Sequence, residues 1–310
     1  MRSTPGITQG QTEYDMPRDP KNLPHRRIQL FIGAILVCLL YVQFALTDEN
    51  EVVLAPRTPI VMAATVAHDP FEKLIQADPL AALKQARERH IAQVKDYRCT
   101  LVKQEMLPSG MSEEQEIDVL FRQEPYSVVL HWQRNPGLAE RVIYVKDRWI
   151  DEDADSPEER EQAVCQPGAI ARLLVKSIKQ PIHGKLARKS SRRYVDEFGF
   201  TKALFLLIKY CDIARAKGEL KLEYCGETRF DGRPVWVVRR TLPYTGEGGI
   251  YPDRIAEIFI DKEYRVPVAV YCFSQDSKEP QHLLGKYEYR NIQLGVGLSE
   301  ADFDPATYGM

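Results

Sequence analysis

The feature that most limits how this chain can fold is an uncharged apolar segment near its N-terminus, residues 28–46. As a helix with a rise of about 1.5 Å per residue, this segment has the length of a hydrocarbon core roughly 30 Å thick. Arg26 and Arg27 directly precede it, whereas Asp48 and Glu49 follow it. Because basic flanks stay in the cytoplasm, we predict one transmembrane helix with its N-terminus inside the cell.

Two other interpretations of this segment are a cleaved signal peptide and a lipoprotein signal. A signal peptide has a shorter apolar region with a small-residue cleavage site close behind it, but the nearest such site, at residues 63–67, lies well beyond Leu46. A lipoprotein signal needs a small residue before its cysteine at the end of the apolar run, whereas Cys38 follows Val37 in the middle. Cleavage therefore stays open as the alternative, and lipidation is not expected.

The rest of the chain divides into three parts. Residues 1–27 lack an apolar period and predict a disordered cytoplasmic tail, residues 47–69 contain Pro56 and Pro59 and predict a linker, and residues 70–310 predict a folded domain. The chain is 44% hydrophobic, which is enough for a sizeable core. Its formal charge of −2 gives no positive field for nucleic acid, so no nucleic-acid partner is predicted.

The folded part shows a few helical segments among many strands. Asp69-Pro70 and Asp78-Pro79 predict helix starts, the second helix running to about residue 95, and further helices are predicted at 169–179 and 200–217. Alternating apolar and polar residues predict strands at 97–106, 115–123, 126–133, 140–146, 219–230, 234–242, 254–261, 266–273 and 284–294. So many strands fit one flat sheet poorly. We therefore predict an α+β fold in which a strongly curved antiparallel sheet, an open and incomplete barrel, wraps around helices.

Two charged segments predict exposed loops. Residues 151–162 are acidic, with a partner-binding site as the alternative interpretation, and residues 185–193 are basic, with contact to anionic lipid headgroups as the alternative. Neither segment by itself identifies a protein partner.

Groups that would mark an enzyme do not converge in the sequence. The six histidines, at 25, 68, 90, 131, 183 and 282, lack metal-ligand spacing, and neither HExxH nor CxxC occurs. Gly295 and Gly297 begin a dinucleotide pattern, but Glu300 occupies the position of its third glycine. We predict no catalytic residue, metal or cofactor. The cysteines of the folded part are expected to be buried free thiols, with a Cys225–Cys272 disulfide as the alternative.

Three segments of the C-terminal half carry a resemblance to known families. They read GETRFDGRPVWVVRRTL at 226–242, IFIDKEYRVPVAVYCF at 258–273 and KYEYRNIQLGVGLSEADFDP at 286–305. Their order resembles the periplasmic lipoprotein-carrier (LolA/LolB-like) superfamily. The whole of residues 70–310 is similar to the uncharacterised bacterial DUF1571 family, whose Y-x-C-x-L-x-K-x-E strand matches Tyr97–Glu105.

The resemblance implies a non-catalytic domain with an apolar cavity for acyl chains, on the periplasmic side of a bacterial inner membrane. The implied lipid-contacting residues alternate along two strands: Tyr126, Val128, Leu130, Trp132, Val142 and Tyr144. A plain packed core would use the same residues, so an envelope scaffold or protein-interaction domain with a filled interior stays open. The carriers are usually released proteins. The predicted anchor departs from that pattern and implies a tethered binding protein for lipid or lipoprotein.

Overall fold

The structure, a computed structural model, describes residues 69–168, 171 and 174–310. The predicted cytoplasmic tail and transmembrane helix, and all of the predicted linker except residue 69, lie outside the described residues. No helix in the described part of the chain has both the length and the apolar character needed to cross a bilayer.

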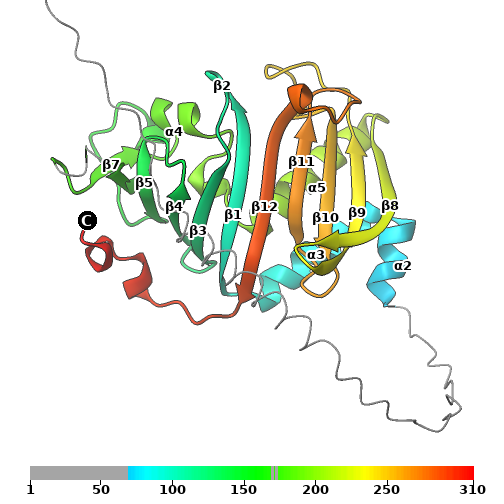
Figure 1. The fold of residues 1–310 in the computed structure, drawn as a ribbon, viewed down its shortest axis with the longest axis horizontal. Helices are drawn as coiled ribbons and strands as arrows, with labels where there is room; N and C mark the ends of the chain where they lie inside the picture. Colours follow the sequence, from blue (N-terminus) through cyan, green and yellow to red (C-terminus); the bar gives the residue numbers. More distant parts are fainter. Residues whose placement is uncertain (1–68, 169–170, 172–173) are drawn as a thin grey trace, which may run out of the picture. The chain divides into compact units, whose positions relative to one another are not determined.

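One antiparallel sheet dominates the described residues (Figure 1). Its strand order is β7-β6-β5-β4-β3-β1-β12-β11-β10-β9-β8, and the short β2 pairs with β1 outside this path. The strands are β1 (Asp96–Leu107), β2 (Gly110–Met111), β3 (Gln115–Arg122), β4 (Ser127–Arg134), β5 (Ala139–Val145), β6 (Gln162–Pro167), β7 (Ile178–Pro181), β8 (Lys221–Phe230), β9 (Arg233–Thr241), β10 (Ile255–Asp261), β11 (Pro267–Phe273) and β12 (Leu283–Leu294). β7 and β8 are the two edges, so the sheet is open.

The sheet consists of two meanders that meet at β1 and β12. Strands β3 to β7 follow one another on one side, and strands β8 to β12 do so on the other. The central pair runs from Tyr97 opposite Leu294 to Glu105 opposite Gly285, with one irregularity between Arg98 and Thr100. β1 and β12, the first and last strands in the sequence, therefore lie side by side in the middle of the sheet.

Within the described residues, four α-helices accompany the sheet: α2 (Pro70–Ala77), α3 (Pro79–Gln93), α4 (Lys185–Ser190) and α5 (Phe200–Ala216). As predicted, Asp69 and Asp78 cap α2 and α3, because their carboxylates accept hydrogen bonds from the backbone N–H groups of Phe71 and Leu80 at 3.0 and 3.1 Å. In Figure 1, α3 and α5 lie behind β9 to β11. They pack there through a shared apolar cluster: Phe71, Ile75, Leu83, Leu204, Trp236, Val238 and Ile258.

The two faces of β4 and β5 carry different partners, because side chains alternate along a strand. Val128 and Tyr144 face the main core with Tyr97 and Phe200. Val129 and Ile143 face the opposite way, and Phe303 of the C-terminal 3₁₀ turn η5 (Glu300–Phe303) packs against them. The turn η6 (Pro305–Tyr308) follows. Other 3₁₀ turns among the described residues are η1 (Pro157–Glu159), η3 (Val195–Glu197) and η4 (Pro280–His282).

The predicted α+β fold with one large antiparallel sheet and helices is confirmed, but two details were wrong. Residues 178–179 belong to β7 rather than to a helix at 169–179, since pairing with β6 satisfies their backbone groups. Most of the basic run 185–193 forms α4 rather than a loop. The described cysteines are free thiols, as expected, but Cys225 is exposed, and Cys165 and Cys272 are only partly buried. The alternative disulfide is excluded, because Cys225 in β8 and Cys272 in β11 are three strand spacings of roughly 4.8 Å apart, about 14 Å in all.

Candidate ligand-binding cavity

A cavity of about 670 Å³ lies between the helix-bearing face of the sheet and the segment that runs from α4 into α5. Most of the side chains that line it are apolar. They come from the central strand β1, from β3 to β7, from α4 and α5, and from β11: Leu101, Ile117, Leu130, Trp132, Val142, Ala163, Ile178, Leu186, Leu206 and Val270. The cavity therefore extends across both meanders.

Three of the six predicted lipid-contacting residues line this cavity. They are Leu130 and Trp132 of β4 and Val142 of β5. Leu130 lies opposite Val142 in the β4–β5 pair, so these two side chains form one continuous patch on the same face of the sheet.

The other three predicted residues lie beneath the cavity in the packed core. Val128 is fully buried, and Tyr144 is nearly so. The hydroxyl of Tyr126 donates hydrogen bonds to the carbonyl oxygens of Val195 and Phe198 at 2.8 and 2.9 Å. Because Val195 and Phe198 line the cavity, Tyr126 holds part of its wall in place.

The mouth of the cavity carries exposed apolar side chains. Leu138, Ile178 and Leu186 line the cavity, although 64%, 40% and 49% of their surfaces are exposed. Leu174 is 86% exposed a few residues before β7. Exposed basic residues alternate with these apolar ones: Lys176, Lys179, Lys185, Arg188 and Lys189. We call the three exposed lining residues Leu138, Ile178 and Leu186 the mouth residues.

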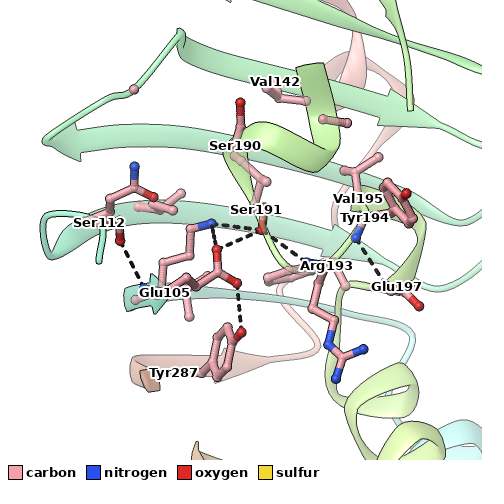
Figure 2. A pocket seen from close by; sticks show the side chains of 18 of the residues that line it. Glu105, Ser112, Val142, Ser190, Ser191, Arg193, Tyr194, Val195, Glu197 and Tyr287 are labelled. Atoms are coloured by element: carbon pink, nitrogen blue, oxygen red, sulfur yellow. Dashed lines mark hydrogen bonds and ion pairs between the residues drawn. The ribbon is translucent and has the colours of Figure 1, made fainter. Parts of the chain in front are cut away.

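A buried ion pair forms the polar part of the wall (Figure 2). The Lys103 ammonium lies 2.9 Å from a carboxylate oxygen of Glu105, whose side chain is only 1% exposed. The hydroxyls of Ser191 and Tyr287 also donate to this carboxylate, at 3.0 and 2.8 Å. Burial by itself raises the pKa of Glu105, but the Lys103 charge and these hydrogen bonds outweigh burial and hold the pKa below its usual value. Glu105 is therefore ionised and fully partnered.

A second buried ion pair lies at the far wall. The Arg240 guanidinium binds both carboxylate oxygens of Asp253, at 3.0 and 2.9 Å, and both side chains are 2% exposed. Arg240 also donates to the carbonyl of Leu207 at 3.4 Å. Arg240 therefore links β9 both to α5, through Leu207, and to the loop before β10, through Asp253.

Arg193 also lines the cavity, but its guanidinium has no partner. Its backbone N–H donates to the Ser191 hydroxyl at 3.4 Å, while the guanidinium makes no hydrogen bond or ion pair with any residue that the structure describes. Figure 2 shows this side chain extending away from Glu105 and Ser191. Burial lowers the pKa of Arg193, but Tyr287 and Glu197 nearby outweigh it, so the pKa lies above its usual value and the group stays a cation.

The described residues hold no group of three or more His, Cys, Asp or Glu side chains that could bind a metal ion. Among these residues, one histidine lies within 3.5 Å of a carboxylate: Nε2 of His183 is 3.1 Å from Oδ2 of Asp196.

Sequence reasoning missed the contribution of α4 and of residues 191–193 to the cavity. The basic side chains of this run predicted a solvated loop. Yet Leu186, Ala187, Ser190 and Ser191 recur three to four residues apart, which is the spacing of one helix face, and all four line the cavity. The small and apolar residues, rather than the charges, were the informative signal.

The family model described as "Protein of unknown function (DUF1571)" matches residues 94–308. This span is more than half of the chain, so the resemblance to the DUF1571 family is confirmed. No curated protein matches the sequence.

The chain is also similar to several solved structures. A crystal structure of MucB shares 13% sequence identity over 73% of this chain and 62% of that chain, with a TM-score of 0.42. The lipoprotein LppX of Mycobacterium tuberculosis shares 13% identity over 73% of this chain and 100% of that chain, with a TM-score of 0.40. LprF of Mycobacterium bovis shares 11% identity over 71% of this chain and 95% of that chain, with a TM-score of 0.35. At this level of similarity none of them indicates what the present chain binds.

Proposed function

The chain belongs to the DUF1571 family, a family of proteins of unknown function, and from that premise we propose that its folded domain binds the acyl chain of a lipid or lipoprotein without chemical change. The observation that carries this proposal is the cavity of about 670 Å³ with mainly apolar walls. Ligand pockets for small molecules commonly measure roughly 300–1,000 Å³ and have apolar walls with few polar groups.

The chemistry of the walls favours an acyl chain over a polar ligand. The charges of Lys103, Glu105, Arg240 and Asp253 are already paired with one another. What remains along the walls is mainly aliphatic and aromatic surface. Each methylene group transferred to such surface contributes about 0.8 kcal/mol, so a long chain could bind tightly without any specific polar contact.

The alternative function is an envelope scaffold or protein-interaction domain. That alternative assumed a filled interior, whereas the side chains at Leu130, Trp132 and Val142 border open volume. The cavity therefore favours the binding function over the scaffold.

We also propose that the domain works next to a membrane. The expected transmembrane segment at 28–46 would hold it on the periplasmic side of a bacterial inner membrane. The mouth residues, together with the exposed lysines beside them, suit contact with anionic lipid at the bilayer surface, because each basic side chain there adds about 1 kcal/mol.

Photo-crosslinking tests the proposal. The full chain would be placed in discs of uncharged phosphatidylcholine with a photoreactive palmitic acid, and the labelled peptides would be identified by mass spectrometry. We expect labels on β4, β5 and α5. The variant Ala203→Phe, which places a ring in the cavity from α5, should lose them.

Ala216→Phe is the matched control, because it makes the same change at an exposed position of the same helix. It should keep the wild-type labels. Labels spread over the exposed surface, or labels equal in both variants, would contradict acyl binding in the cavity.

A further inference from the structure

We infer that Arg193 binds the anionic head of the ligand, so that the cavity selects a chain ending in an oxyanion, a carboxylate or a phosphate, over a neutral lipid. This inference rests on the proposed function and names the class of ligand. Its starting point is the unpaired guanidinium of Arg193 in the wall of a mainly apolar cavity.

The buried charges in the cavity wall are already paired. Lys103 binds Glu105, and Arg240 binds Asp253 through two contacts. Arg192, the neighbour of Arg193, donates instead to the carbonyl oxygens of Leu284 and Pro252, at 2.7 and 3.1 Å. Arg192 therefore serves the fold, and Arg193 is left with its side-chain donors available.

The carboxylates near Arg193 are engaged with other groups. Glu197 accepts a hydrogen bond from the backbone N–H of Tyr194 at 3.2 Å and makes no ion pair with Arg193 among the described residues. Glu105 is surrounded by Lys103, Ser191 and Tyr287. An unpaired cation beside apolar surface is unfavourable, so an anion from the ligand would relieve that cost.

The chemistry of the guanidinium identifies the group that it would bind. Its planar fork of N–H donors matches the two oxygens of a carboxylate or of a phosphate and binds them through paired hydrogen bonds. A hydroxyl offers one acceptor and no charge. We therefore expect the cavity to prefer a fatty acid over the alcohol of the same length by roughly ten- to a hundredfold, the range of hydrogen bonds to charged groups.

The experiment compares two photoreactive probes of equal length, palmitic acid and its alcohol, on the full chain in discs of uncharged phosphatidylcholine. For each probe the half-saturating concentration for labelling of cavity peptides is measured. Partition of a probe into the disc is the same for every variant, so it cancels from the ratio between variants. Arg193→Gln should raise the half-saturating concentration of the acid roughly ten- to a hundredfold and leave that of the alcohol unchanged.

Two further variants distinguish the loss of the Arg193 guanidinium from the loss of any positive charge. Lys217→Gln removes the same charge from an exposed residue outside the cavity and should keep the preference for the acid. Arg193→Lys keeps the charge but not the fork, and should retain part of the preference. Labelling by the alcohol shows that each variant is folded.

The outcomes distinguish a failure of the Arg193 inference from a failure of acyl binding itself. Equal labelling by acid and alcohol in the wild type, or an unchanged acid preference in Arg193→Gln, would overturn the role of Arg193 while acyl binding stands. Labelling by neither probe would overturn both. Displacement of the acid by millimolar inorganic phosphate would show that the site takes a free anion instead of a lipid head, and would also overturn the inference.

Discussion

Replacing Lys103 by Met should destabilise the folded domain by about 3 kcal/mol at pH 7, because it leaves a buried carboxylate without its cation. Removing one partner of a buried ion pair commonly costs about 3–5 kcal/mol. The lower end applies here, since Glu105 keeps three other donors: the hydroxyls of Ser191 and Tyr287 and the backbone N–H of Arg192.

The size of this loss should depend on pH. In the wild type the pKa of Glu105 lies below its usual value, so its contribution is present above the unfolded pKa of about 4.3 and is lost as the pH falls through the folded value. In Lys103→Met burial outweighs the remaining hydrogen bonds and the pKa of Glu105 rises. The folded variant then binds a proton more readily than the unfolded chain, so the difference from the wild type should shrink between pH 7 and pH 4.

Urea unfolding followed by tryptophan fluorescence measures both effects. Lys189→Met is the matched control, because this lysine lines the same cavity but is exposed, and its loss should stay within about 0.5 kcal/mol. Replacing both Lys103 and Glu105 by Met should cost less than Lys103→Met alone. A loss below about 1 kcal/mol at pH 7, or one that does not shrink at pH 4, would refute this reasoning.

Three further predictions concern the cavity, a tight backbone contact and the mouth. Affinity for fatty acids from octanoic acid upward should rise about fourfold per methylene group until the cavity is full, as a displacement assay would show; a flat series would count against acyl burial. Gly199→Ala should lower stability by about 1–3 kcal/mol in thermal unfolding, since φ is +97° and the new Cβ would lie 2.8 Å from the Phe121 ring. Gly246→Ala, at φ +102° in open space, should cost less. Leu186→Glu should slow ligand transfer from anionic vesicles in stopped-flow fluorescence, and an unchanged rate would argue against the mouth as the route of entry.

The long strands could be predicted from the sequence because their alternation is strong. β3 shows this: Ile117, Val119 and Phe121 all face the core as expected. The short strands β6 and β7 could not be predicted, since six and four residues give too few alternations, and their pairing depends on β5. Tertiary pairing, rather than local preference, decides such segments.

The division between core and cavity could not be predicted either. Val128 and Leu130 are successive residues on the same face of β4, yet the first is fully buried and the second borders the cavity. Both positions require an apolar side chain. What separates them is how closely other segments of the chain pack over each position, which the sequence of β4 does not contain.

The pairing of β1 with β12 has a consequence for how the chain matures. The partners Tyr97 and Leu294 are about two hundred residues apart, so the centre of the sheet cannot close until nearly the whole chain has left the ribosome. Until then β1 lacks its β12 neighbour, and a long strand with an unpaired edge is prone to associate with other chains. A nascent chain held at the membrane and shielded by a chaperone would avoid this hazard, whereas a chain that ends before Leu283 would lack the middle of its sheet.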